Sequence, residues 1–233
     1  MTLSETFSIV LVEPQDPINI GSVARAMMNL GFVNLRLVSP ERSFEEHALR
    51  SACWAEKIVR DATIFETLEQ AISDQQFAVG FSARSGKNRP TLPLKSWLTG
   101  TEVQDGRRIA LVFGPEDCGL RQEHHNFLNL LVTIPSAMEY RCYNLAQAVL
   151  LVLYEIFTLQ PSASNPTEVP TLQQIKQLDV MLDKLIEKSG FLTKGTPAEV
   201  PELLRGIFRR APLRSERELT ILLGFLSRLD KGL

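Results

Sequence analysis

The chain has 233 residues, of which 44% are hydrophobic and 22% charged, and its formal net charge is −2. This is the composition of an ordinary globular protein, and no run approaches the roughly 20 consecutive apolar residues that a membrane-spanning helix needs. Residues 171–233 hold 11 Lys and Arg against 8 Asp and Glu, so the balance there is +3, against −5 in the rest of the chain. Any contact with RNA should therefore involve the C-terminal part and local patches.

The cysteine content indicates a reducing compartment. Cys53, Cys118 and Cys142 are widely spaced and form no Cys-x-x-Cys pair. An odd number of scattered cysteines fits reduced thiols better than a disulfide framework or a zinc site. The first five residues contain no basic segment of the kind that opens a secretory signal. We therefore expect a cytoplasmic protein without a bound metal ion.

Short apolar runs alternate with helical patterns over the first 160 residues. Helices are predicted at 20–30, where Gly31 ends the helix, and at 44–60 and 66–73. Strands are predicted at 7–12, 35–38, 77–81, 109–113 and 131–135. Apolar strands separated by helices indicate an α/β fold, with a parallel sheet covered by helices on both faces.

The stretch 144–159 is apolar around its whole circumference. Leu145 and Val149 lie on one face of the predicted helix, while Leu150 and Phe157 belong to the remainder, which is nearly as apolar. A helix that is hydrophobic on all sides must be buried on all sides. This predicts a second covering surface, for which another subunit is one candidate. A central helix within a monomer is the other.

The C-terminal third has a different organisation. Residues 160–166 are rich in Pro, Ser and Asn, a composition typical of a linker. Thr171 and Gln174 have the spacing of a capping box, and Ser215 and Glu218 repeat it, so a helix is predicted after each, with a further one at 199–210. The predicted organisation is a domain at 1–160, a linker at 161–170 and a small all-α extension at 171–233.

Three segments lie where predicted strands end, which is where open α/β sheets bind ligands. The first runs from Asn19 to Ala26. Asn19 is a good N-cap residue, and Gly21 leaves room for the close approach of another backbone. Arg25 follows about one turn after Gly21, on the same side of the helix. Spacing alone favours a capped helix with a surface arginine.

The second and third segments are loops with distinctive residues. Phe113–Leu120 contains two glycines in six positions, which suits a loop around a planar ligand, but also a turn with acidic residues near a helix start. Ile134–Ala148 leads into the apolar helix, for which Asn144 is the predicted N-cap. Neither loop matches a Walker A motif or the G-x-G-x-x-G fingerprint. Nucleotide-hydrolysing chemistry is therefore disfavoured.

Together these segments resemble, in order and spacing, the three motifs of the SPOUT-class RNA 2′-O-methyltransferases, and in particular the TrmJ-type tRNA enzymes of the TrmH group. The residues that carry the resemblance are Asn19–Arg25, Phe113–Leu120 and, in the third motif, Ile134-Pro135 with Asn144–Val149. Segments 10–14, 80–84 and 204–211 are also similar to that subgroup. The resemblance therefore spans nearly the whole chain.

The resemblance implies a fold, a cofactor and a set of site residues. The fold would be a sheet domain with a C-terminal trefoil knot, an exception to the rule against threaded chains, in a homodimer with active sites at the subunit interface. The cofactor would be S-adenosyl-L-methionine, and the catalytic residues would be Arg25, Asn19, Glu116 and Asn144. By position, the cofactor contacts would be Phe81, Ser82, Ala83, Gly114, Ile134, Arg141, Cys142, Tyr143 and Leu145.

The implied reaction is methylation of a ribose 2′-hydroxyl in the tRNA anticodon loop, with ribosomal RNA as the alternative target. The family assigns proton removal to the arginine matching Arg25. Because guanidinium groups stay protonated in proteins, Arg25 is better suited to bind the target phosphate and stabilise the developing alkoxide. Glu116 and Asn19 would orient it.

The third motif departs from the family at Cys142, where a serine is usual. A thiol is a much weaker hydrogen-bond partner for an arginine than a hydroxyl is. A catalytically silent RNA-binding relative is therefore the alternative to an enzyme. In the extension, the candidate RNA contacts are Arg205, Arg209, Arg210 and Arg214, because planar guanidinium groups suit phosphate geometry; a solvated helix face is the other interpretation.

Overall fold

The computed structural model describes residues 3–41, 43–83, 91–100, 103, 106–137, 139, 142–159, 169–189, 205–206 and 215–232. The chain divides into two compact units. The first contains residues 1–72 and 77–166, and the second contains residues 73–76 and 167–233. Within the described segments, no helix has both the length and the apolar character needed to cross a membrane.

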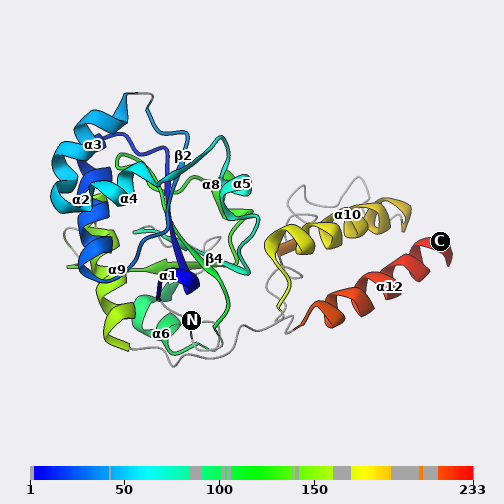
Figure 1. Ribbon diagram of the computed structural model, residues 1–233. Coiled ribbons are helices and arrows are strands. Elements are labelled where there is room, and N and C mark those ends of the chain that lie inside the picture. Colours follow the sequence, from blue (N-terminus) through cyan, green and yellow to red (C-terminus); the bar gives the residue numbers. More distant parts are fainter. Residues whose placement is uncertain are drawn as a thin grey trace. The chain divides into compact units, whose positions relative to one another are not determined.

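The first unit is built on a seven-stranded sheet in which every pairing is parallel (Figure 1). The strand order is β3-β2-β1-β6-β4-β7-β5. The central strands are buried along nearly their whole length, as a sheet covered on both faces requires. The strands are β1 (Phe7–Val12), β2 (Leu35–Val38), β3 (Thr63–Phe65), β4 (Phe77–Phe81), β5 (Leu92–Pro93), β6 (Ile109–Phe113) and β7 (Leu130–Thr133).

Helices cover both faces of this sheet. Figure 1 shows α2 and α9 on one side of it and α5 and α8 on the other. The helices of the first unit are α1 (Leu3–Thr6), α2 (Pro17–Asn29), α3 (Phe44–Ala52), the 3-10 turn η1 (Cys53–Ala55), α4 (Glu56–Arg60), α5 (Leu68–Ile72), α6 (Leu94–Leu98), α8 (Gln122–His125) and α9 (Leu145–Leu159).

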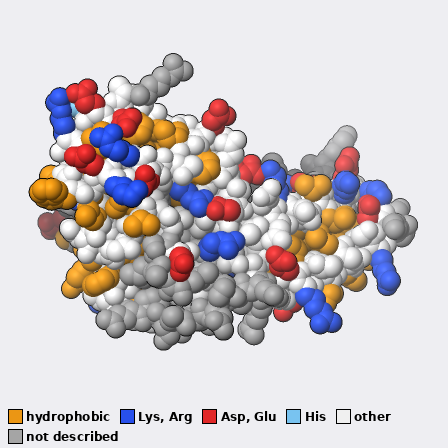
Figure 2. All heavy atoms as spheres, viewed as in Figure 1, with side chains coloured by type: hydrophobic (Ala, Val, Ile, Leu, Met, Phe, Trp, Pro, Cys, Tyr) orange, Lys and Arg blue, Asp and Glu red, His pale blue; other side chains and the backbone are white. Residues whose placement is uncertain are grey.

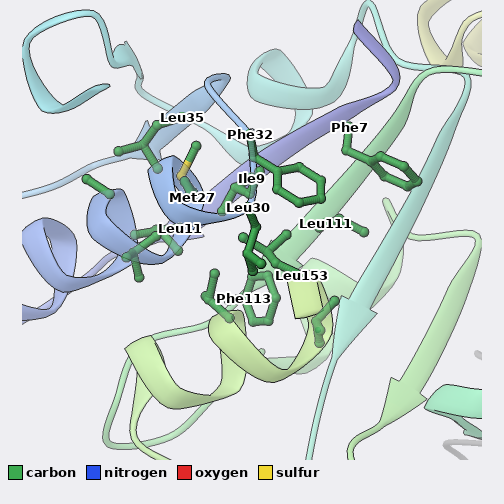
Figure 3. Packing of buried hydrophobic residues seen from close by; sticks show 14 of the residues in the cluster. Phe7, Ile9, Leu11, Met27, Leu30, Phe32, Leu35, Leu111, Phe113 and Leu153 are labelled. Carbon is green, nitrogen blue, oxygen red and sulfur yellow. The ribbon is translucent and has the colours of Figure 1, made fainter. Parts of the chain in front are cut away.

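The core of the first unit lies between the sheet and the pair α2 and α9. Side chains from β1, β6, α2 and α9 converge there, among them Ile9, Leu11, Met27, Leu111 and Leu153, all fully buried (Figure 3). Full burial of a large aliphatic side chain contributes about 1.5–3 kcal/mol. The core therefore holds both helices firmly against one face of the sheet, and these are the helices that carry the first and third sequence motifs.

The α/β fold class with a parallel sheet is confirmed. The strands predicted at 7–12, 35–38, 77–81 and 109–113 have those bounds in the structure, and the fifth runs from Leu130 to Thr133 instead of 131–135. Strands β3 and β5 were not predicted, because they have only three and two residues and leave most side chains exposed. The trefoil knot remains an expectation from the family resemblance.

Helix α2 begins three residues earlier than predicted. The side chain of Asp16, not that of Asn19, caps it by accepting a hydrogen bond of 2.9 Å from the N–H of Ile18. Pro17 occupies the first helical position, where its missing N–H costs nothing. Asn19 lies instead in the buried first turn. The predicted end is confirmed, because Gly31 has φ +78°, the left-handed conformation that ends many helices.

The helix predicted over 44–60 is interrupted. Cys53 has φ +52°, a left-handed conformation that no α-helix continues through, so α3 ends at Ala52 and a short turn leads to α4. The break leaves the side chain of Trp54 93% exposed. The apolar periodicity of the sequence does not reveal this break. The residue type does not reveal it either, because cysteine is not a residue that commonly ends helices.

The described part of the second unit contains two long helices and a short segment from elsewhere in the chain. Its helices are α10 (Leu172–Lys188) and α12 (Glu216–Gly232), which pack through Leu178, Leu182, Leu219 and Leu226. Both predicted caps are present: the Thr171 hydroxyl accepts from the N–H of Gln174, and the Ser215 hydroxyl accepts from that of Glu218. Residues 73–76 join this unit through hydrogen bonds to residues 169, 172 and 173. The helix predicted at 199–210 lies largely outside the described residues.

Candidate active site

A pocket opens at the carboxyl ends of β4, β6 and β7. It is formed by the loops that follow these strands and by the start of α9, and its volume is about 810 Å³ with the open mouth included. Eight of the nine predicted cofactor contacts line it, and the ninth, Arg141, lies outside the described residues. The lining residues are Phe81, Ser82, Ala83, Phe113, Gly114, Pro115, Glu116, Asp117, Cys118, Gly119, Ile134, Cys142, Tyr143, Leu145 and Ala148.

The floor of the pocket is aromatic and rigid. The rings of Phe81 and Phe113 stack with centroids 4.6 Å apart, and Trp97 packs edge-on against Phe81 at 6.0 Å. The two stacked residues are the last of β4 and β6, which pair directly, so the sheet itself positions them. Sequence reasoning assigned Phe81 to the pocket but not Phe113, although both end apolar strands.

The loop after β6 folds back tightly on itself at Gly114. A Cβ atom at this position would lie 2.3 Å from the backbone nitrogen of Leu120 and 2.4 Å from the carbonyl carbon of Gly119. Gly119 has φ +64°, and its N–H donates to the carbonyl of Pro115 at 2.9 Å. Both predicted glycines therefore have a structural reason, and together they bring backbone groups to the pocket surface.

A hydrogen-bonded chain joins the three sequence motifs. The amide of Asn19 donates to the Glu116 carboxylate at 2.8 Å, and its oxygen accepts from the amide of Asn144 at 2.9 Å. The Asn144 oxygen accepts in turn from the N–H of Ala146, as the predicted N-cap of α9. Residues up to 125 positions apart in sequence thus meet in one place. Glu116 lines the pocket, so the chain links the pocket wall to the first turn of α2.

Helix α2 presents Arg25 to solvent. Gly21, one turn earlier, allows the backbone of α3 to pack directly on α2: a Cβ atom there would lie 2.2 Å from the carbonyl oxygen of Ala48. This confirms the close approach predicted for Gly21. The Arg25 side chain is exposed and, among the described residues, has no hydrogen-bond or ion-pair partner and does not line the pocket.

Two acidic groups supply the charge of the described pocket lining. Glu116 is engaged by Asn19 and by the backbone N–H groups of Gln15 and Asp16. Asp117 is exposed, and hydrogen bonds from the Cys118 thiol and then from Gln15 hold the pKa of its carboxyl below the usual value. These hydrogen bonds therefore favour the charged form of Asp117 at this wall of the pocket.

Arg121 connects the same loop to the end of β1. Two of its guanidinium nitrogens contact the two carboxylate oxygens of Glu13, at 3.3 and 2.9 Å. A hydrogen bond with Cys118, and secondly the charge of Glu13, raise the pKa of Arg121. No sequence signal pointed to this pair, because its members are 108 positions apart and lie outside any common motif.

The third motif forms the opposite wall of the pocket. Tyr143 is held by a hydrogen bond of 2.8 Å from its hydroxyl to the carbonyl of Pro135, and Leu145 is buried at the start of α9. Cys142, the residue that replaces the usual serine, is exposed and lines the pocket. Cys142 therefore borders the space where a ligand would bind.

The arginines predicted to contact RNA are only partly described. Arg205 is 25% exposed and forms an ion pair of 2.6 Å with Asp183, so its guanidinium is already engaged within the second unit. Arg209, Arg210 and Arg214 lie outside the described residues. Their role in RNA binding stays a prediction.

The chain is similar to known RNA methyltransferases over its whole length. Residues 6–154 match the SpoU rRNA Methylase family. The tRNA (cytidine/uridine-2′-O-)-methyltransferase TrmJ of Photorhabdus laumondii is 33% identical over 97% of this chain and 98% of its own length. The crystal structure of TrmJ from Z. mobilis ZM4 has a TM-score of 0.81 and 28% identity, covering 96% of this chain and 98% of that one.

A more distant structure shows the same fold. The SpoU methyltransferase AviRb from Streptomyces viridochromogenes, solved in complex with AdoMet, has a TM-score of 0.54 and 18% identity, over 70% of this chain and 63% of that one. The parallel sheet, the pocket at its carboxyl edge and the hydrogen-bonded motif residues occur in a chain that matches the family over most of its first unit. The chain therefore belongs to the SpoU rRNA Methylase family.

Proposed function

We propose that this chain is an S-adenosyl-L-methionine-dependent tRNA 2′-O-ribose methyltransferase that modifies a nucleotide of the anticodon loop. The observation that carries the proposal is the hydrogen-bonded chain Glu116–Asn19–Asn144, in which Asn19 is the central residue and three family motifs meet at the wall of one pocket. The full-length similarity to tRNA (cytidine/uridine-2′-O-)-methyltransferases supports tRNA over ribosomal RNA as the substrate.

The pocket fits the cofactor in its chemistry. The apolar walls around Phe81 and Ile134 suit an adenosyl group, and the close backbone at Gly114 can hydrogen-bond to it. Glu116 and Asp117 place negative charge near a cofactor whose sulfonium is positive. When bound, S-adenosyl-L-methionine supplies the activated methyl group, and this chemistry requires no metal ion.

Arg25 is proposed as the group that acts on the RNA. Its exposed guanidinium is free, among the described residues, to bind the phosphate beside the target ribose. From there it stabilises the negative charge that develops on the 2′-oxygen as the hydroxyl loses its proton. Because guanidinium groups stay protonated, the proton passes to a phosphate oxygen or to water. Asn19 and Glu116 fix the first turn of the helix that carries Arg25.

A homodimer would complete this site. The exposed face of α9 carries Leu150, Tyr154 and Phe157, and α2, which packs beside it, exposes Ile18 and Met28. Figure 2 shows hydrophobic side chains gathered on the flank of the first unit where α2 and α9 lie. An apolar surface of this kind on a helix that is buried on its other face indicates a protein contact. The second subunit would cover it beside Arg25.

The second unit is proposed to bind RNA, and the protein to act in the cytoplasm. Support for the first point is the basic balance of residues 171–233, which contrasts with the acidic balance of residues 1–170. Support for the second is the set of scattered cysteines, all free, and the absence of a membrane-spanning helix in the described segments.

The test is methylation itself. The purified chain is incubated with methyl-labelled S-adenosyl-L-methionine and, in separate reactions, with tRNA or with ribosomal RNA, and ribose methylation is mapped by resistance to alkaline cleavage. The expected result is one protected position in the tRNA anticodon loop. Label in ribosomal RNA alone would establish the alternative target. Cofactor binding without methylation of any RNA would favour a catalytically silent RNA-binding protein, for which Cys142 provides a reason.

The role of Arg25 has its own test. Arg25→Ala should lower kcat by at least about 100-fold, because it removes stabilisation of the transition-state charge. The calorimetric Kd for the cofactor should change by less than about twofold, since Arg25 does not line the pocket. Arg36→Ala is not a suitable control, because that side chain is partly buried and donates to the carbonyl of Ala71. Arg50→Ala is the matched one, because its ion pair with Glu46 joins two exposed side chains of α3 and contributes little to stability. Substantial turnover by Arg25→Ala would remove Arg25 from the mechanism.

A further inference from the structure

The loop between β1 and α2 is held at two points by the loop that follows β6. At the first point, the Glu116 carboxylate accepts from the N–H of Gln15 at 2.9 Å and from that of Asp16 at 3.2 Å. At the second, Arg121 pairs with Glu13 through two nitrogens, at 3.3 and 2.9 Å. Two-point pairs of a guanidinium with a carboxylate fix orientation as well as distance. At the second point, Glu13 belongs to the segment 10–14, and Arg121 directly follows the motif segment Phe113–Leu120.

Glu13 has an unusual backbone. Its φ is +47°, in the left-handed region that residues with a side chain rarely adopt, while its N–H still donates to the carbonyl of Val38 at 2.8 Å. Backbone conformations of this kind persist only where surrounding contacts hold them, and they cluster at functional sites. Glu13 is thus fixed from both sides, through its N–H by β2 and through its carboxylate by Arg121.

Arg121 is fixed in turn. Its backbone N–H donates at 3.2 Å to Nδ1 of His124, a buried residue of α8. It follows directly on the segment Gly114–Leu120, most of which lines the pocket. The ion pair therefore connects the pocket wall to residue 13, four positions before α2 begins at Pro17. Helix α2 carries Arg25, so the pair lies between the two halves of the proposed active site.

We propose that Arg121 and Glu13 are positioning residues that keep α2, and with it Arg25, in fixed register with the cofactor loop. The inference rests on the proposed methyltransferase function. A structural role alone does not account for the pair, because its side chains are 47% and 37% exposed, and ion pairs at that exposure stabilise a fold very little. We expect the pair to affect the rate of the chemical step instead, because a small displacement of the reacting groups slows that step strongly.

A neighbouring acid provides the control. The carboxylate of Glu123 lies 3.6 Å from the Arg121 guanidinium but belongs to α8, so it has no link to the β1–α2 loop. Glu123→Gln removes an acidic partner of Arg121 and leaves the pair with Glu13 in place. Any effect that comes only from the loss of a negative charge beside Arg121 should appear in this variant as well.

The experiment compares Arg121→Gln, Glu13→Gln, the double variant and the charge-swapped chain with Glu13→Arg and Arg121→Glu. Each single variant should lower kcat about tenfold, with the KM for the cofactor changed less than about twofold. The double variant should be no slower than either single one, because both remove the same interaction. The charge swap should recover part of the rate, and Glu123→Gln should retain the wild-type rate. Thermal unfolding should be nearly unchanged throughout.

Three outcomes would overturn the inference. These are unchanged kcat in both single variants, losses that multiply in the double variant, and a rise in cofactor KM with kcat intact, which would confine Arg121 to cofactor binding. Hydrogen exchange gives a readout that does not depend on turnover. In the wild type, S-adenosyl-L-methionine should slow exchange both in residues 114–121 and in the first turn of α2. In Arg121→Gln, the cofactor should slow hydrogen exchange in residues 114–121 but not in the first turn of α2. If the wild type binds the cofactor but methylates no RNA, the proposed function fails, while this comparison still decides the coupling.

Discussion

At the scale of single residues, replacing Gly114 should reduce both the stability of the fold and its affinity for the cofactor. Gly114→Ala places a methyl group 2.3 Å from the backbone nitrogen of Leu120, and backbone atoms cannot move aside as side-chain ends do. The overpacking should destabilise the fold by about 1–3 kcal/mol. It should also weaken cofactor binding more than about tenfold, since the displaced segment lines the pocket. Thermal unfolding and calorimetry measure the two effects.

The matched control is Gly224→Ala, where an added Cβ meets nothing within 4 Å. Gly224 lies inside α12, and alanine in a helix interior is more stable than glycine by roughly 0.5–1 kcal/mol. Gly114→Ala should therefore lower the free energy of unfolding, and Gly224→Ala should raise it. A Gly114→Ala chain with wild-type melting temperature and cofactor affinity would show that the loop after β6 can relax, contrary to its close packing.

The motif residues were predictable individually, but their contacts were not. The family resemblance assigned Asn19, Glu116 and Asn144 to one site, but no local pattern indicates that the amide of Asn144 donates to the oxygen of Asn19 across 125 positions. The same holds for Glu13 and Arg121. Such contacts depend on how strands that are distant in the chain are ordered in the sheet, and local patterns do not determine that order.

At the scale of elements, α8 contains a group whose ionisation affects folding. His124 is buried, and burial is the main reason that its pKa lies below the usual value of 6.5; Arg121 also lowers it, while Glu13 and Glu123 raise it. The neutral ring accepts the N–H of Arg121 at Nδ1. The folded protein therefore binds the proton more weakly than the unfolded chain does. This contribution to stability is present above the unfolded pKa and is lost as pH falls through the folded pKa.

The expected result is a pH-dependent difference between variants. From about pH 7.5 to pH 5.5, the melting temperature of the wild type should fall more steeply than that of His124→Gln, which has no proton to bind. His47→Gln, on the exposed face of α3, should keep the wild-type slope. Equal slopes for the wild type and His124→Gln would mean that His124 is protonated as easily in the fold as in the unfolded chain.

Element prediction succeeded where burial dictated the sequence and failed where it did not. Strands β1, β2, β4 and β6 are almost wholly buried, so each is a mostly apolar run, interrupted only by Ser8 in β1 and Arg36 in β2. The exposed β3 and β5 have no such run. The start of α2 was misplaced because Asp16 and Asn19 are both good caps, and only the position of Pro17 decides between them.

At the scale of the whole molecule, the burial of α9 bears on the prediction that a second surface covers this apolar helix. One face, including Val149, Val152 and Ile156, is buried in the core of the first unit. The opposite face leaves Tyr154 54% and Phe157 44% exposed. A central position within a monomer would bury both faces, so the described structure favours the other interpretation, in which a second subunit covers this surface.

The dimer proposal leads to the last prediction. Tyr154→Glu combined with Phe157→Glu should give a folded monomer, because charges at these exposed positions cost little in the single chain but would be buried without a partner in a dimer. Sedimentation measures the change in mass, and circular dichroism verifies the fold. Ile64→Glu, equally exposed but on the edge strand β3, should leave the dimer intact. Methylation should be lost with the dimer, since the proposed site includes Arg25 on the adjacent helix. A double variant that remains dimeric would place the subunit contact elsewhere on the molecule.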